Sequence, residues 1–369
     1  MSQVTPRQLY SASDLLDGFN PWDPMGYMLT RDFSVFRQFV TDGGPVPASI
    51  AVRMSQAEHD AGIADALRRF LSYMQRPLVG VMGGHGVARN SDPYRDIAYL
   101  TRTLARKGFL LVTGGGPGVM EAAHLGVAFS SFDDESHLED AISILSETPY
   151  VPVLDELFEG DGTIKESKLD ALVAARDWLT KALKAREMAP AILPVSLAIP
   201  TWLYGAEPTM PFATHYAKYF QNSLREEALI NNSRAGIVYG RGGGGTMREI
   251  FQDVERNYYA KKLDEVTPMI FFDRDDYWRR DADYGDPAKT VPGIKLDVTV
   301  RNALEFGLRS GKLPPADVKR CLDEKLRLTN DVDVTISALQ SHAAASKRNL
   351  NYALAAQPMM LSGLRMNRR

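Results

Sequence analysis

Cysteine and long apolar runs are both scarce in this sequence, and their scarcity excludes several classes of protein. Cys321 is the single cysteine of the 369 residues, so the chain can form no internal disulfide and no cysteine-rich metal site. The most apolar run, residues 189–200, is interrupted by three prolines and is too short to span a bilayer. No basic stretch followed by an apolar core opens the chain, so no secretory signal is expected. These features predict a protein of the reducing cytoplasm that does not enter a membrane.

An excess of basic charge is also missing. The chain has 43 Lys and Arg against 46 Asp and Glu, a net charge of −3, which gives no general attraction to nucleic acid or to anionic membranes. Acidic residues gather in the first half of residues 131–189, but His137 is the only histidine near them, so neither a metal ion nor another cofactor is expected. With 44% hydrophobic and 24% charged residues, the composition is that of a folded globular protein.

Short apolar runs alternate with amphipathic segments along the middle of the chain. Residues 78–82 and 109–112 are typical of buried strands, and residues 92–107 and 119–129 have apolar side chains at helical spacing. Such an alternation predicts an α/β fold, with a Rossmann-like parallel sheet and helices on both of its faces. Further strands are expected at residues 191–199, 236–239 and 268–273, the last of these being the final clear strand.

Proline- and glycine-rich stretches and changes in composition divide the chain into a core and three additional segments. We expect an N-terminal helical arm at residues 1–75, which packs on the core or on a second subunit, and a Rossmann-like core at 76–275. A C-terminal helical extension is expected at 276–369. The core contains an acidic and helical insertion, residues 131–189, which is either a solvated addition or a lid over the site. Helices are also expected in residues 55–74, where Ser55 and Glu58 resemble a capping box, and in residues 215–232, 298–310, 315–325 and 331–346.

Neither of the common nucleotide fingerprints is present. After the first predicted strand, Gly84-His85-Gly86 lacks the third glycine of G-x-G-x-x-G, and the second strand ends in Thr113 rather than in an acid that could hold a ribose. No glycine cluster is followed by the Lys-Ser or Lys-Thr of a Walker A loop. Glycine clusters nevertheless follow three of the predicted strands, whose carboxyl ends face one crevice in an open α/β sheet. Each cluster alone is also compatible with a tight turn.

The third cluster, residues 240–246, joins a strand to a helix. A glycine-rich turn before a helix lets the backbone approach a phosphate, and the helix start offers unpaired N–H groups. Glu249 lies one turn into that helix, where its charge opposes an anion. The conflict indicates that Glu249 has either a chemical role or an ordinary place in the first turn of the helix.

Two of these clusters resemble the signatures of a known family. Residues 113–123, TGGGPGVMEAA, resemble the GGGPGxMEA signature of the Lonely Guy (LOG) family, and residues 241–249, RGGGGTMRE, resemble its PGGxGTxxE signature. The similarity covers residues 77–275. Three positions depart from the pattern: Arg241 replaces the signature proline, Glu226 replaces a common lysine, and His124 replaces a frequent asparagine. The first two change the charge beside the expected phosphate site.

The resemblance implies a Rossmann-like fold, a homodimer or larger homo-oligomer, and hydrolysis of nucleoside 5′-monophosphates to a free base and ribose 5-phosphate. The catalytic pair of the family falls on Arg225 and Glu249. The substrate would be bound by the glycine turns and by residues of the helices that follow them: Gly83, Gly84, Gly114, Gly115, Gly116, Gly118, Glu121, Gly242, Gly243, Gly244, Gly245 and Thr246. Glu121 is equally compatible with being an ordinary acid that stabilises the first turn of its helix. Trp202 and Tyr204 are candidates to stack on the base, although packing in the core or at an interface explains them better.

Two other functions remain compatible with the sequence. The turns would bind without turnover in a carrier of a nucleotide or of a molybdenum-type cofactor, as in related Rossmann proteins. Alternatively, the chain would be a regulatory oligomer that acts through its insertion and extensions. Decarboxylation of amino acids is disfavoured because no lysine accompanies the glycine turns, and Lys261 and Lys262 lie only at the far end of the helix that follows the third turn.

Overall fold

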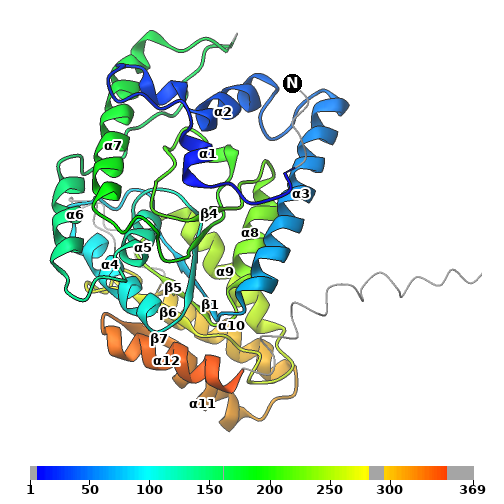
Figure 1. Cartoon of the computed structure of the whole chain (residues 1–369). Helices are drawn as coiled ribbons and strands as arrows, with labels where there is room; N and C mark the ends of the chain where they lie inside the picture. The colour runs from blue at the N-terminus through cyan, green and yellow to red at the C-terminus, as the bar shows by residue number, and fades with distance from the viewer. Residues whose placement is uncertain (1–5, 161, 282–294, 347–369) are drawn as a thin grey trace, which may run out of the picture.

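A computed structural model describes residues 6–160, 162–281 and 295–346 (Figure 1). Its centre is a seven-stranded sheet in the order β4-β3-β2-β1-β5-β6-β7, in which every neighbouring pair is parallel. The strands are β1 (Leu78–Met82), β2 (Leu110–Thr113), β3 (Leu197–Ala198), β4 (His215–Tyr216), β5 (Gly236–Tyr239), β6 (Met269–Phe272) and β7 (Leu326–Thr329). The predicted α/β class with a parallel, Rossmann-like sheet is confirmed.

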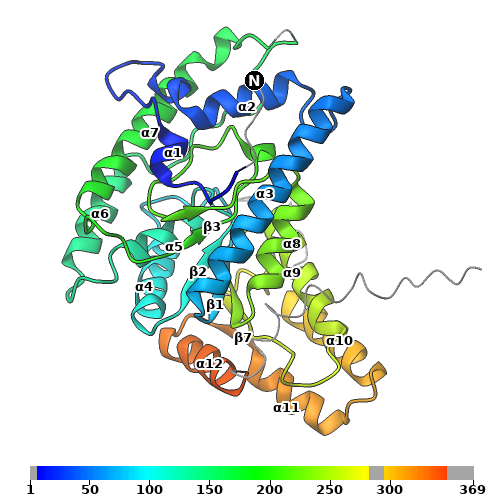
Figure 2. The ribbon, with the colours of Figure 1, turned by 45° about the vertical axis from the view of Figure 1, so that its right-hand side comes forward.

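Side chains alternate between two apolar layers along each central strand. Val79 and Val81 of β1 belong to one core cluster, whereas Leu78 and Met82 belong to the other. The first layer contains side chains of α4 (Asp92–Arg106), α5 (Val119–Ala128), α6 (Ser136–Ser146), α7 (Leu169–Glu187) and α12 (Val332–Ala345). The second contains side chains of α3 (Ile50–Met74), α8 (Asn222–Asn232), α9 (Gly244–Tyr258), α10 (Leu296–Ser310) and α11 (Pro315–Lys325). Figure 2 shows α4 and α5 on one side of the strands and α3, α8 and α9 on the other, as expected for a sheet buried on both faces.

The order of the strands reverses beside β1. From β1 the chain adds β2, β3 and β4 on one side, and β5, β6 and β7 then follow on the other side. Ligands of open α/β sheets bind outside the carboxyl ends of the strands at such a reversal. Here the turns after β1 and β5 are tied together, since the Gly84 N–H donates to the Arg241 carbonyl at 2.7 Å.

Three predicted segments differ clearly in their bounds, and one strand was not predicted. Pro190 and Pro194 lack the N–H that a sheet interior requires, and the strand expected at 191–199 is reduced to β3. The segment expected as one helix from 215 to 232 begins instead as β4, and α8 starts at Asn222. The helix expected at 55–74 begins earlier, because Ser49 caps it at Val52, so the proposed capping box is wrong. β7 was missed, since four residues between two helices carry too short a pattern.

The N-terminal arm packs on the core, one of its two predicted positions. It contains α1 (Ala12–Leu16), a 3-10 turn (Gly26–Leu29) and α2 (Arg31–Thr41) ahead of α3. In α3 the Asp60 carboxylate accepts hydrogen bonds from the backbone N–H groups of Phe220 and Gln221, both at 2.9 Å. The arm therefore holds the backbone that leads into α8.

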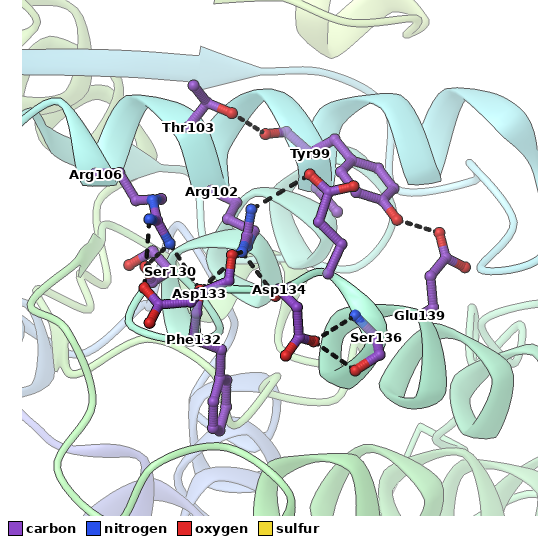
Figure 3. Close-up of polar contacts among 12 residues, drawn as sticks. Tyr99, Arg102, Thr103, Arg106, Ser130, Phe132, Asp133, Asp134, Ser136 and Glu139 are labelled. Carbon is purple, nitrogen blue, oxygen red and sulfur yellow. Dashed lines mark hydrogen bonds and ion pairs between the residues drawn. The ribbon is translucent and has the colours of Figure 1, made fainter.

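The acidic start of the insertion is fixed by side chains of α4 (Figure 3). The Arg102 guanidinium donates to the carbonyl oxygens of Phe132 and Asp134, both at 2.7 Å, and the Tyr99 hydroxyl donates to Glu139. Further along, α7 buries Trp178 in the first apolar layer. These acids thus have structural partners, and no group of acids, histidines or cysteines in the described part of the chain is arranged to hold a metal ion.

The helices of the described ranges are also too short or too polar for a membrane. None of them combines the length and the apolar character that a membrane-crossing helix needs.

Candidate functional site

A cavity of about 510 Å³ opens where the carboxyl ends of β1, β2 and β5 meet. The predicted crevice is therefore present, and the glycine turns after all three strands line it. The remaining walls come from the segment between β3 and α8, from the start of α9 and from Tyr277. Its lining includes these predicted residues: Gly83, Gly84, Gly114, Gly115, Gly116, Arg225, Gly242, Gly243, Gly244, Gly245, Thr246 and Glu249.

Arg225 and Glu249 meet at the base of this cavity. Arg225 projects from α8 and Glu249 from α9, and Nη1 of the arginine lies 3.2 Å from Oε1 of the glutamate. Both side chains are 9% exposed, so little water screens the pair. The Arg225 Nε also donates to the Ile199 carbonyl at 3.0 Å, which fixes the guanidinium at the end of β3. This ion pair is therefore buried within the cavity lining.

A second carboxylate lies beside the pair. Glu226 follows Arg225 in α8, and its carboxylate accepts hydrogen bonds from Asn222 at 2.8 Å and from Gln252 at 3.2 Å. The Arg248 guanidinium contacts it at 2.8 Å. Burial raises the pKa of Glu249 above its usual range, the charge of Arg225 opposes this rise, and the charge of Glu226 adds to it.

The start of α9 presents exposed backbone N–H groups to the cavity. The helix begins at Gly244 after Gly243, and Gly243, Gly244 and Gly245 are all exposed. Side chains are absent at these positions, so the first N–H groups of the helix are open to a ligand in the cavity. Such a helix start attracts an anion such as a phosphate. The Thr246 hydroxyl is a further donor at the same place.

The turn after β2 is held by a buried histidine. His124 of α5 bonds to the Thr113 hydroxyl and to the Ser196 hydroxyl, both at 2.9 Å, and Thr113 in turn accepts the N–H of Gly115 at 2.9 Å. Burial lowers the pKa of His124 to about 3, so the ring stays neutral. The departure from the family pattern at residue 124 therefore supports the shape of the turn.

Two predicted binding residues do not line the cavity. Glu121 is a residue of α5 and is fully buried. Arg89 donates to its carboxylate at 2.6 and 2.8 Å, and the Tyr94 hydroxyl donates to it at 3.1 Å. Its role is to anchor α5, since an unpaired buried charge would be costly. Gly118 has a φ of 66° and comes so close to the carbonyl oxygen of Gly84 that a Cβ would overlap it. Gly118 thus allows two turns to pack together.

Lys218 is a functional candidate that the sequence did not reveal. It lines the cavity, and its ammonium contacts Asp32 of α2 at 2.6 and 2.8 Å. The same carboxylate accepts hydrogen bonds from Thr209 at 2.5 Å and from Trp202 at 3.0 Å. The fold therefore brings a lysine to the glycine turns, although none accompanies them in the sequence. No sequence signal could have found it, because Asp32 and Lys218 lie 186 positions apart.

The two base-stacking candidates differ in position. Trp202 is buried and stacks on Phe220, with ring centroids 4.5 Å apart, whereas Tyr204 is half exposed and lines the cavity. Packing in the core therefore explains Trp202, whereas Tyr204 is not part of the core.

Charged contacts also cross the mouth of the cavity. His85 Nδ1 lies 2.7 Å from Glu207 Oε1, and this bond raises the pKa of the histidine above its usual range. Arg241 points away from the glycine turn toward Asp273, at 3.4 Å, and Asp275. The arginine that replaces the signature proline therefore ties the turn after β5 to the end of β6.

Comparison with known proteins gives one family match. The model of the SLOG cluster4 family matches residues 76–131, which contain β1, α4, β2, α5 and the first two glycine turns. The match points to the SLOG superfamily, which is related to the LOG family, and it indicates a nucleotide-related function. No curated protein matches the chain.

Proposed function

We propose that this protein hydrolyses the N-glycosidic bond of nucleoside 5′-monophosphates, giving a free base and ribose 5-phosphate. The observation that carries the proposal is the buried contact of Arg225 with Glu249, at 3.2 Å, in a cavity whose other wall is an exposed glycine-rich helix start. The partial SLOG match and the two LOG-like signatures support the same conclusion.

Cleavage of such a bond builds positive charge on the ribose. A carboxylate near the anomeric carbon stabilises that charge and can take a proton from the attacking water. Glu249 is suited to this task, since it lies one turn beyond the phosphate seat at Gly243–Thr246 and opens into the same cavity. Arg225 orients the carboxylate and helps to hold it ionised through a charge-assisted hydrogen bond.

A nucleotide panel tests the proposal directly. The full chain is incubated with AMP, GMP, CMP and UMP, and free base and ribose 5-phosphate are measured. Glu249→Gln should lower kcat by about 100-fold or more, because it removes the base and charge stabiliser. It should leave nucleotide affinity largely intact. Glu255→Gln, an exposed position on the same helix, is the matched control. Full activity of Glu249→Gln would exclude the assignment.

Arg225→Ala should also lower kcat/KM strongly, since the buried Glu249 then loses its orienting partner. An unchanged kcat/KM would indicate that the ion pair of Arg225 with Glu249 has only a structural role. Binding of nucleotides without release of base by the unsubstituted protein would favour the carrier of a nucleotide or cofactor over the hydrolase.

A further inference from the structure

Each basic side chain that lines the cavity is already paired with an acid. The contacts are Lys218 with Asp32, Arg225 with Glu249, and Arg241 with Asp273 and Asp275. Two further lining carboxylates, Glu207 and Glu226, have His85 and Arg248 as their partners. Among the described residues of the cavity and their partners, the carboxylates therefore outnumber the lysines and arginines.

This balance limits how the cavity can hold an anion. A phosphate must rest mainly on the backbone N–H groups of Gly243–Thr246, because the guanidinium and ammonium groups are engaged elsewhere. The other charged groups that would surround the ribose and base are mostly carboxylates. The charge of Glu226 acts as far as Glu249, whose pKa it raises. The field of these carboxylates favours a substrate with positive charge away from its phosphate.

We propose, on the basis of the proposed function, that the preferred substrate is a pyridinium ribotide, such as nicotinamide mononucleotide, whose glycosidic nitrogen is already cationic. The carboxylates Glu226 and Glu249 then stabilise a positive charge that the substrate brings with it. A purine ribotide is neutral at its base and must also be protonated as the base leaves.

The segment between β3 and β4 suits a cationic ring. Tyr204 lines the cavity and its side chain is half exposed, and Glu207 lies on the same loop, with its N–H bonded to the Tyr204 carbonyl at 3.1 Å. A cation is attracted both to the face of a tyrosine and to a carboxylate. The two side chains therefore provide the base subsite, in the same cavity as the phosphate seat at the start of α9.

The reaction balances without a general acid for the base. Water adds to C1′ of the ribose as the C1′–N bond breaks, and the bonding electron pair neutralises the pyridinium nitrogen. The products are neutral nicotinamide, ribose 5-phosphate and one proton. Glu249 accepts that proton from the attacking water and returns it to solvent. Hydrolysis of AMP, by contrast, consumes the proton on the departing adenine.

Parallel assays of nicotinamide mononucleotide and AMP test the inference on the full chain. We expect kcat/KM for nicotinamide mononucleotide to exceed that for AMP by at least about tenfold, because the attraction of one neighbouring carboxylate for the cationic ring is large enough to give such a difference. One proton should be released per nicotinamide formed. A preference for AMP or another purine ribotide would overturn this inference and leave the proposed hydrolase intact. Release of base from none of the nucleotides would overturn both.

Two matched variants test the role of charge. Glu226→Gln should lower the ratio of the two kcat/KM values roughly tenfold, because one buried charge near the base is lost. Glu227→Gln, on the exposed side of α8, should leave the ratio unchanged. A merely structural role of Glu226 would lower both activities equally, and that outcome would contradict the inference.

Glu207→Gln provides a second variant if Glu226→Gln does not fold. Glu207 lies on a loop at the mouth of the cavity, so its substitution leaves the core intact. The ratio should again fall, and an unchanged ratio in a folded Glu207→Gln protein would count against a cationic base subsite.

Discussion

The residue that departs most informatively from the family signatures is Glu226. Its carboxylate is bound by Asn222, Gln252 and Arg248, so it stays in place beside the catalytic candidates. Its negative charge acts on Glu249, whose pKa is already raised by burial. Two neighbouring carboxylates in different environments often divide the roles of an acid–base site. Here burial raises the pKa of Glu249, and the charge of Glu226 adds to that rise.

The pH dependence of the reaction follows from this arrangement. Glu249 must be ionised to act, and its pKa lies above the ordinary 4.5, so kcat/KM should fall with decreasing pH at a value above 4.5. Glu226→Gln removes a charge that raises this pKa, and the acid limb should move to lower pH. A pH profile of both proteins measures the shift, with Glu227→Gln as the control. An acid limb at the same pH in both proteins would show that the Glu226 charge does not reach the site.

At the scale of elements, the glycine turns leave room for the side chains of the two catalytic candidates. The turn after β2 passes so close to α8 that a Cβ on Gly114 would overlap the Arg225 guanidinium. In the turn after β1 the need for glycine differs by position, since a Cβ on Gly83 would overlap the Val119 side chain, whereas a Cβ on Gly86 would meet no atom within 4 Å. The absence of a side chain is therefore required by the geometry at Gly114 and Gly83 and not at Gly86.

Gly114→Ala should consequently displace Arg225 and lower kcat/KM by about 10- to 100-fold, comparable to misplacing a catalytic group by an ångström. Thermal unfolding should change little, because the cavity can accept the moved guanidinium. Gly86→Ala is the matched control and should keep its activity. Equal activity of both variants would show that the position of Arg225 is not critical.

At the scale of the whole molecule, the N-terminal arm helps to position residues that line the site. Asp32 of α2 gathers Lys218, Thr209 and Trp202, and Asp60 of α3 holds the approach to α8. The C-terminal extension contributes in the same way, since Tyr277 lines the cavity and β7 extends the sheet. The predicted core of residues 76–275 thus depends on both neighbours for the walls of its site.

Removal of the arm's buried anchor should destabilise the fold. Asp32→Asn leaves the Lys218 ammonium buried without its partner, a change that typically costs about 3–5 kcal/mol. Chemical denaturation should show this loss, whereas Asp65→Asn, which breaks an exposed pair with Arg68, should cost about 1 kcal/mol or less. The double variant Asp32→Asn with Lys218→Met should recover part of the loss. No difference between Asp32→Asn and Asp65→Asn would mean that the anchor does not stabilise the chain.

The sequence by itself determined the class of the fold and the elements that carry the site. Alternating apolar runs and helical spacing predicted β1, α4, β2, α5, β5 and α9, because period and length are local properties that each segment carries alone. The same local reasoning placed the glycine clusters at strand ends and predicted that they share one crevice, which the cavity lining confirms.

Only the tertiary structure decided which charged side chains meet. Glu121 lies in the first turn of α5 and Glu249 one turn into α9, yet Glu121 is buried against Arg89 whereas Glu249 lines the cavity. Lys218 and Asp32 come together from distant parts of the chain, and β7 joins the sheet after two further helices. Such pairings depend on the packing of whole elements, and no period or spacing in the sequence encodes them.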